Sequence, residues 1–334
     1  PVLEYKQQAG RAGRPKYDSF GIAYTLAKDE DEKDFIQEHF INGSLEEIYS
    51  RLGAHPVLRF HILASIAGNF ARSREEVFDF VKSTFFGHQY GQDKELEAII
   101  GNVLQELSDW DFITEEEYLK PTRIGHRVSQ LYIDPATAYK YLEKLGGEIR
   151  GPLGLLETLC EAVEIRKLSV KRSEEPKLWA LAQQAGGEFA FDLDGFDVDW
   201  MFLDRFKTSL MFQDWICESS EEEIMEKYSV TPGQLYAQLQ NMEWLVYAAQ
   251  ELAKIKKYPA YPRLLQIGLR LKYGVGAELL ELVGLKHVGR VRARMLYKNN
   301  LKTIDDLKKA PLKNLAGIVG GKTAGKIKEQ LINY

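Results

Sequence analysis

Apolar positions along most of the chain recur at the three-to-four-residue spacing of amphipathic helices. Residues 96–107 show this spacing clearly, which predicts a helix with one buried face. A longer stripe over 235–253 predicts a second helix that begins at Thr231 and Pro232, because threonine caps helix N-termini and proline suits the first turn. The short apolar run Val2–Tyr5 is strand-like instead.

Short helices followed by a hairpin fill residues 41–134. Ser73 begins a capping-box pattern, and the polar turn within 112–125 predicts a two-stranded wing. Together these features predict a winged-helix domain, a fold that often places a helix in the DNA major groove. The surface of the long helix is acidic here, with Glu95 and Glu97. We therefore favour a bracing role for this domain over duplex recognition.

Residues 135–258 predict an all-helical domain, and its long helix carries a candidate stacking residue. At about 100° per residue, Trp244 lies roughly opposite the apolar stripe, and Gln240 shares its face. An aromatic side chain opposite the buried face suits base stacking, which contributes about 1–3 kcal/mol per base. Packing against a neighbouring domain is the alternative. We predict that Trp244 and Gln240 bind nucleic acid.

Two pairs of short helices around glycine-containing turns, near 282–297 and 315–332, predict tandem helix-hairpin-helix units. Backbone N–H groups at such turns bind phosphate without reading sequence. The first turn has His287 where the usual G-x-G pattern has its first glycine. The residues predicted to contact nucleic acid here are Lys286, Gly289, Arg290, Arg292, Arg294, Lys322 and Lys326.

Charge is distributed unevenly along the 334 residues, whose net charge is −5. From Lys254 onward there are 18 Lys and Arg against 5 Asp and Glu, so this tail carries +13 and the remainder −18. A basic tail on an acidic body is typical of nucleic-acid binding, although a solvated basic surface has the same composition.

Several classes of protein are disfavoured by composition. The two distant cysteines, Cys160 and Cys217, indicate a reducing compartment and no disulfide framework. The scattered histidines do not suggest a metal site. No apolar run reaches the roughly 18 residues of a membrane span, and no signal peptide is evident. We expect a cytoplasmic monomer without a membrane association.

Gln7–Pro15, with the sequence QQAGRAGRP, places two arginines three positions apart among glycines. Glycines let the backbone approach a ligand closely, and the planar arginine cation suits phosphate oxygens. Such a pair can neutralise charge on a transferred phosphoryl group; the alternative is a solvated surface turn. The predicted nucleotide-binding residues are Gln7, Gly10, Arg11 and Arg14, with Arg11 and Arg14 also catalytic.

The spacing Q-x-x-G-R-x-G-R resembles the last conserved motif of helicase superfamily two, in its Ski-two-like branch. Further stretches resemble the archaeal Hjm-type DNA helicases, which are related to the helicase part of polymerase theta: PVLRFHILASIAGNFARS, RVSQLYIDPATA and VGRVRARMLY. The resemblance covers essentially the whole chain. It implies a mainly α C-terminal fragment with four parts: the end of the second motor domain (1–40), a winged helix (41–134), a helical ratchet domain (135–258) and a helix-hairpin-helix domain (259–334).

The resemblance also implies an activity. A helicase of this family uses ATP to move 3′ to 5′ on single-stranded DNA and unwinds forked or branched DNA in replication-fork repair and recombination. Its partners would be single-stranded and forked DNA, and other replication or recombination proteins. ATP and Mg²⁺ would be bound mainly by an upstream motor, because this sequence has no G-x-x-x-x-G-K-[ST] loop. The fragment alone is expected to hold no cofactor and to be inactive.

Particular residues take family roles by the same resemblance. Trp244 matches the stacking residue of the ratchet helix, whereas Ala237 stands where some relatives carry an arginine. Arg292 and Arg294 match an arginine cluster in a terminal domain that grips the emerging strand and acts as a brake. Two alternatives stay open: an RNA helicase of the same branch, and a non-enzymatic helix-hairpin-helix protein, which leaves Gln7–Pro15 unexplained.

Overall fold

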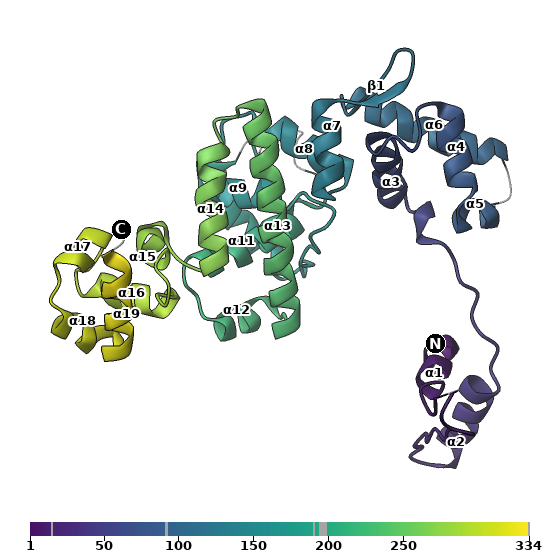
Figure 1. The fold of residues 1–334 in the computed structure, drawn as a ribbon, viewed down its shortest axis with the longest axis horizontal. Helices are drawn as coiled ribbons and strands as arrows, with labels where there is room; N and C mark the ends of the chain where they lie inside the picture. The colour runs from purple at the N-terminus through teal and green to yellow at the C-terminus, as the bar shows by residue number, and fades with distance from the viewer. Residues whose placement is uncertain (15, 91–92, 190, 194–198, 333–334) are drawn as a thin grey trace. The chain divides into compact units, whose positions relative to one another are not determined.

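A computed structural model describes the chain except for residues 15, 91–92, 190, 194–198 and 333–334 (Figure 1). The described residues are mainly helical, as predicted, and their strands form a single two-stranded sheet. They divide into two compact units, residues 1–53 with 82–91, and residues 54–81 with 92–334.

The first unit begins with α1 (Val2–Ala9), so the prediction of a strand at Val2–Tyr5 was wrong. A four-residue apolar run does not distinguish strand from helix, and the residues after it (Lys6–Ala9) favour helix. The Glu46 carboxylate accepts the backbone N–H groups of Val2 and Leu3 at 2.5 and 2.9 Å, which satisfies two free donors at the start of the helix.

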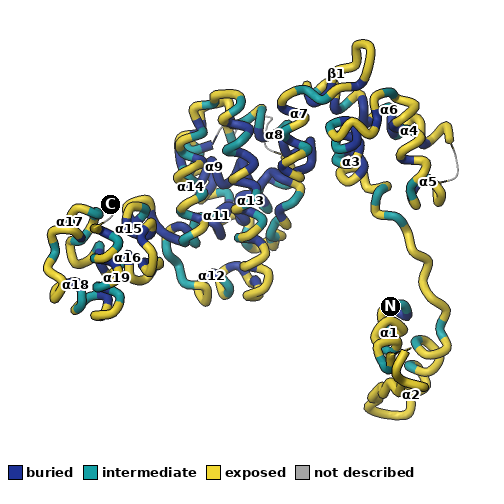
Figure 2. Tube along the Cα trace, in the orientation of Figure 1, coloured by how far each residue is buried: buried dark blue, intermediate teal, exposed yellow. Residues whose placement is uncertain are grey.

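The segment that follows, residues 17–27, forms no regular element. Its aromatic and apolar side chains are exposed, as Figure 2 shows for most of this unit. A charged helix, α2, comes next and continues as a π-helical turn. The elements of the unit after α1 are α2 (Glu30–Ile36), the π-turn Gln37–Ile41, a 3₁₀ turn (Arg51–Gly53) and α5 (Phe85–Tyr90).

The second unit opens with the predicted three-helix arrangement and wing. The antiparallel wing pairs Thr114 with Lys120. Gly125 is required where the last helix begins, because a Cβ there would lie 1.8 Å from the Phe112 carbonyl oxygen. The elements are α3 (His55–Ala67), α4 (Arg74–Lys82), α6 (Asp93–Asp109), β1 (Ile113–Glu115), β2 (Leu119–Pro121) and α7 (Arg123–Leu131).

A helical bundle follows, and the cap predicted at Thr231 is formed. The Asp134 side chain accepts the N–H of Ala136 at the start of α8, and Thr231 forms a capping box with Gln234 at the start of α13. The bundle comprises α8 (Pro135–Leu145), α9 (Pro152–Leu159), α10 (Glu175–Gln184), the 3₁₀ turn Gly186–Glu188, α11 (Phe202–Ile216), α12 (Glu221–Tyr228), α13 (Pro232–Lys256) and α14 (Tyr261–Tyr273).

Helix α14 packs alongside α13 (Figure 1), and Gln250 donates to the Leu264 carbonyl across this contact at 2.9 Å. The bundle therefore continues past residue 258, where the sequence suggested a domain boundary.

The last part has a hydrophobic core of its own, which includes Leu282, Leu296, Leu315 and Ile327. This core lies under two helical hairpins, as the glycine turns predicted. The elements are the 3₁₀ turn Ala277–Leu279, α15 (Leu280–Val283), α16 (Arg290–Lys298), α17 (Ile304–Lys309), α18 (Leu312–Val319) and α19 (Gly321–Leu331).

Candidate nucleic-acid interface

The arginine turn follows directly from α1. Gly10 ends the helix, and Gly13 adopts φ +82°, a left-handed conformation that suits glycine. Gly21 packs against this turn so closely that a Cβ on it would lie 2.0 Å from the Ala12 carbonyl oxygen. The turn is thus held in place by the backbone on both sides, and Pro15, the last residue of the predicted motif, lies outside the described residues.

Both arginines of the turn extend into solvent, as does Gln7 on α1. Arg14 stacks over the Tyr17 ring at 5.2 Å, and its backbone N–H donates to Asp18 at 2.7 Å. The Arg11 guanidinium is exposed. An exposed guanidinium on a fixed turn fits a role in contacting phosphate supplied from outside the unit, so the nucleotide roles of Gln7, Gly10, Arg11 and Arg14 stay predictions.

Trp244 lies opposite the apolar stripe of α13, but it is not a free platform. The indole is half-buried, and its N–H donates to the carbonyl of Leu131 at the end of α7, 2.9 Å away. One turn or two further along, Arg127 of α7 donates to Tyr247 and Glu251 of α13 at 3.1 and 2.8 Å. This face of α13 is therefore partly covered by α7, and the stacking role of Trp244 stays a prediction.

Gln240 lies one turn before Trp244 and is exposed, with its amide donating to the Tyr236 hydroxyl at 2.8 Å. Ala237 is exposed as well. The part of the face that precedes Trp244 is consequently open to solvent, while the part that follows it contacts α7.

The two hairpin turns expose backbone at the N-termini of α16 and α19. Gly320 adopts φ +84°, and positions for a Cβ on Gly289, Gly320 and Gly321 have no neighbour within 4 Å. His287 adopts φ +70°, so the first turn keeps the left-handed conformation that glycine usually supplies. The first N–H groups of a helix have no partner inside it and attract anions.

The two turns adjoin one hollow of about 440 Å³. Gly289, Val291 and Arg292 line it from the first hairpin, and Ile318 and Val319 line it from the end of α18, just before Gly320. The N-terminus of α16 and the last residues of α18, which lead into the Gly320 turn, therefore border the same hollow.

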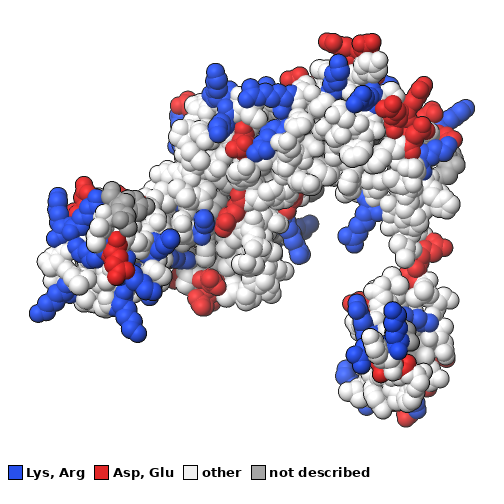
Figure 3. All heavy atoms as spheres, in the orientation of Figure 1, with Lys and Arg blue, Asp and Glu red and all other residues white. Residues whose placement is uncertain are grey.

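The predicted cations around these turns differ in whether their side chains are already held by other residues. Lys286, Arg292, Lys322 and Lys326 are exposed, and Arg292 donates to the His287 carbonyl at 2.9 Å. Figure 3 shows Lys and Arg side chains gathered over this part of the chain. These four side chains can approach a phosphate without first breaking an ion pair.

Arg290 and Arg294 are instead engaged with the helical bundle. Arg290 donates to the Ser219 carbonyl and lies 5.0 Å from the centre of the Trp215 ring, and burial lowers the pKa of its guanidinium. Arg294 pairs with Glu218, 2.8 Å from Nε, and with Glu278, and these carboxylates raise its pKa further. A phosphate contact by either arginine would have to displace these partners, so their nucleic-acid role stays a prediction.

One feature was missed in the sequence. A pocket of about 370 Å³ lies beside α13 and is bordered by the loop 166–171. Gln234, Gln238 and Asn241 line it at spacings of four and three residues, which places them on one helix face. This row of three polar side chains on one face of the helix was the signal that could have indicated the pocket.

Within the described residues, no group of three or more His, Cys, Asp or Glu side chains is placed to hold a metal ion. In the same part of the chain, every helix is too short or too polar to cross a bilayer.

Three family models match the chain. A model described as archaeal helicase, domain 4 covers residues 153–274, a helix-turn-helix domain covers 23–114, and a SAM-like helix-hairpin-helix tandem covers 279–331. The second and third agree with the predicted helix-turn-helix type domain and terminal hairpins. The first covers the bundle that holds α13 and α14.

Individual relatives extend this similarity over nearly all of the chain. An ATP-dependent DNA helicase Hel308 from Methanocella arvoryzae is 37% identical over 99% of this chain and 46% of its own length. Proteins of the same name from Caldivirga maquilingensis and Pyrococcus abyssi are 36% and 34% identical over 99% and 100% of the chain. The chain is a homologue of the Hel308 helicases. It spans about half the length of the Hel308 relatives cited here, and its similarity to them agrees with the predicted resemblance to archaeal DNA helicases.

Proposed function

We propose that this chain is the C-terminal part of an ATP-dependent helicase that moves 3′ to 5′ on single-stranded DNA and unwinds forked DNA. The observation that carries the proposal is the pair of open helix N-termini at Gly289 and Gly320, which lie within a cationic part of the chain. Contacts of this kind position a backbone without reading its sequence, which is what a motor that moves along any strand requires. The Hel308 similarity supports the same function.

The first residues of the chain and the domains that follow them would have different roles. Arg11 and Arg14 would contact the terminal phosphate of ATP, whose Mg²⁺ and remaining contacts an upstream motor would supply. The helical bundle and the hairpins would hold DNA, with Trp244 stacking on a base. A chromosomal DNA substrate would place the activity inside the cell, in replication-fork repair and recombination and alongside other proteins of those processes.

The test joins this chain to the upstream motor of its own gene and measures DNA-stimulated ATP hydrolysis. We expect Arg14→Ala to lower the stimulated rate by about 10³-fold or more, the magnitude typical of arginine fingers, and to leave DNA affinity unchanged. Arg51→Ala, which removes another exposed arginine of the same unit, is the matched control. Hydrolysis at the wild-type rate in Arg14→Ala would contradict the nucleotide role.

Binding of the chain alone to forked DNA and to an RNA of matched sequence tests the substrate. We expect tighter binding to DNA across a salt series. Equal or tighter binding to RNA would favour the RNA helicase alternative, and DNA binding without any stimulation of ATP hydrolysis in the joined protein would favour the non-enzymatic one.

A further inference from the structure

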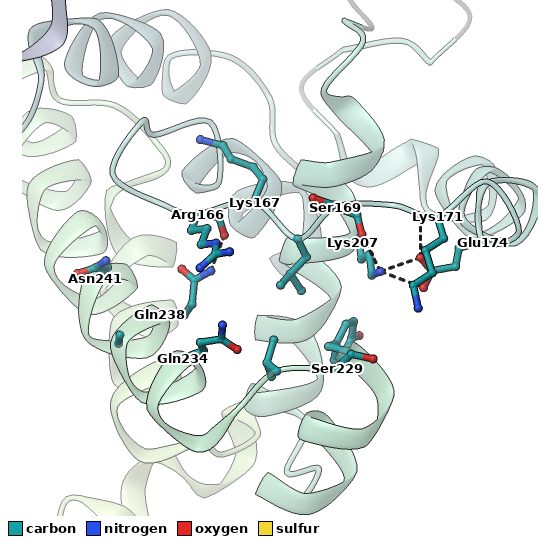
Figure 4. Close-up of a pocket in the computed structure, with 14 residues that line it drawn as sticks. Arg166, Lys167, Ser169, Lys171, Glu174, Lys207, Ser229, Gln234, Gln238 and Asn241 are labelled. Carbon is teal, nitrogen blue, oxygen red and sulfur yellow. Dashed lines mark hydrogen bonds and ion pairs between the residues drawn. The ribbon is translucent and has the colours of Figure 1, made fainter. Parts of the chain in front are cut away.

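The pocket beside α13 combines apolar walls with an excess of cations (Figure 4). The loop 166–171 forms one side, α13 forms another, and Tyr228 and Val230 lie at the end of α12 and just after it. Its volume of about 370 Å³ accommodates a group larger than a bare phosphate.

Two of the four cations that line the pocket are already satisfied. Lys207 is buried and pairs with Glu174 at 2.8 Å, with a further hydrogen bond to the Ser169 carbonyl at 3.1 Å. Lys167 donates to the Ala162 carbonyl, and burial lowers the pKa of its ammonium group.

The other two cations, Arg166 and Lys171, are exposed. Among the described residues, neither side chain has a hydrogen-bond or ion-pair partner. Glu174 is the only carboxylate among the residues that line the pocket. It pairs with Lys207 and also accepts the backbone N–H of Lys171 at 2.8 Å, so four cations share a single carboxylate.

Gln238 supplies a second and independent indication of a ligand. Its side chain is only 6% exposed, and its amide N–H donates to the Arg166 carbonyl, which ties α13 to the loop. Its Oε1 atom has no hydrogen-bond donor within the described residues. A buried acceptor without a donor is costly, and a ligand that carries an N–H group would satisfy it.

We propose that this pocket holds one nucleotide of single-stranded DNA, with its phosphate on Arg166 and Lys171 and a base N–H directed to Gln238 Oε1. The base would lie between the apolar side chains of Leu168, Val230 and Tyr228. All four DNA bases carry an N–H donor on an edge, so the contact tolerates any sequence.

The position of the pocket on α13 agrees with this role, which rests on the proposed helicase function. Ala237 lines the pocket and lies seven residues before Trp244, two turns earlier on the same face and about 10 Å along the axis. A strand stacked on Trp244 could therefore continue along the exposed part of α13 into the pocket. With an alanine at position 237, α13 itself offers no cation there, and the loop supplies two.

The direct test is photocrosslinking of the full chain to a single strand that contains 5-iodouracil in place of thymine. We expect a crosslink to the peptide that carries Tyr228 or to the 166–171 loop, identified by mass spectrometry. Ala237→Phe, which fills the pocket from α13, should abolish it, whereas Ala180→Phe, at an exposed alanine of α10 outside the pocket, should not. A crosslink that persists in Ala237→Phe, or no crosslink in this region, would overturn the proposal.

Binding across a salt series measures the phosphate contact. Arg166→Ala with Lys171→Ala should weaken binding of an unlabelled single strand about 5- to 10-fold and reduce the slope of log K against log salt by about 1.4, two contacts at about 0.7 each. Arg172→Ala with Lys177→Ala, two exposed cations outside the pocket, is the matched control. An equal change in both pairs would overturn the proposal, and a wild-type chain that does not bind the strand would overturn the proposed function as well.

Two further arms separate the possible sources of the nucleotide. A strand built of abasic units keeps its phosphates and should bind wild type and Ala237→Phe equally, because it has no base to place. Free deoxynucleoside monophosphate, added at micromolar concentrations before irradiation, should not lower the yield of the crosslink. A lower yield in wild type but not in Arg166→Ala with Lys171→Ala would assign the pocket to a free nucleotide and overturn its assignment to a strand.

Discussion

Trp244 has two roles to fill with one side chain, packing against α7 and the predicted stacking on a base. Its N–H is used by the Leu131 carbonyl, which fixes the ring against α7, while a base would need access to a ring face. The half-buried state allows both, since a hydrogen bond at the ring edge leaves part of the face accessible. A base stacked on Trp244 would therefore contact a ring that is also hydrogen-bonded to α7.

Substitution of Trp244 separates these two roles. Trp244→Phe removes the N–H donor but keeps a ring, so we expect a loss of about 1 kcal/mol in the free energy of unfolding and a small loss of single-strand affinity. Trp244→Ala removes the ring in addition to the donor, so we expect it to weaken single-strand binding by about 1–3 kcal/mol. Urea unfolding and fluorescence titration measure the two effects, and a Trp244→Ala chain that binds as tightly as wild type would leave only the packing role.

At the scale of elements, local signals predicted the structure well. The cap at Thr231 and the wing were confirmed because each depends on residues within a few positions of one another. The strand expected at Val2–Tyr5 failed because a short apolar run is ambiguous. The covering of Trp244 could not be predicted, since it depends on α7, more than 100 residues earlier in the chain.

The pocket beside α13 could not be predicted for the same reason. Its polar row on α13 is visible in the sequence, but the cations that face it come from a loop about 70 residues earlier, as the hydrogen bond from Gln238 to Arg166 shows. Only the packing of the bundle brings them together. Likewise, Arg290 and Arg294 were predicted as free cations, and their carbonyl and carboxylate partners lie largely on the bundle.

Arg59 joins three elements of the second unit. Its buried guanidinium donates two hydrogen bonds to Asp134 and one to Glu106, and each is 2.9 Å long. Arg59→Met would leave the Asp134 carboxylate buried without its cation, and we expect a loss of about 3–5 kcal/mol in the free energy of unfolding. Urea unfolding measures this loss.

Arg74 offers a matched control for that experiment. It also binds a carboxylate through two hydrogen bonds, to Glu115, but both side chains are well exposed. Arg74→Met should change the free energy of unfolding by less than about 1 kcal/mol. Similar losses in the two variants would mean that burial of the Arg59 pair does not determine its contribution.

At the scale of the whole molecule, the sequence divides charge between an acidic body and a basic end, and Figure 3 shows Lys and Arg side chains gathered over that end. The predicted phosphate contacts occupy only one end of each hairpin. Lys322 lies in the first turn of α19, which begins at the Gly320 turn, and Lys326 lies one turn further along. Lys298 ends α16 and Lys313 begins α18, each at the end of its helix opposite the Gly289 or Gly320 turn. All four are exposed. If only net charge mattered, the two pairs would contribute equally to DNA binding. If the turns set where the phosphates lie, the pair on α19 would contribute more.

Neutralising each pair therefore tests whether geometry or net charge controls binding. Lys322→Gln with Lys326→Gln should reduce the slope of log K against log salt for duplex DNA by about 1.8, two contacts at about 0.9 each, because two counterions fewer are released. Lys298→Gln with Lys313→Gln removes the same charge and should leave the slope nearly unchanged. Fluorescence anisotropy across a salt series measures both. Equal slopes in the two double variants would show that the terminal domain attracts DNA by its overall charge, and that the helix N-termini at the turns do not set where the phosphates lie.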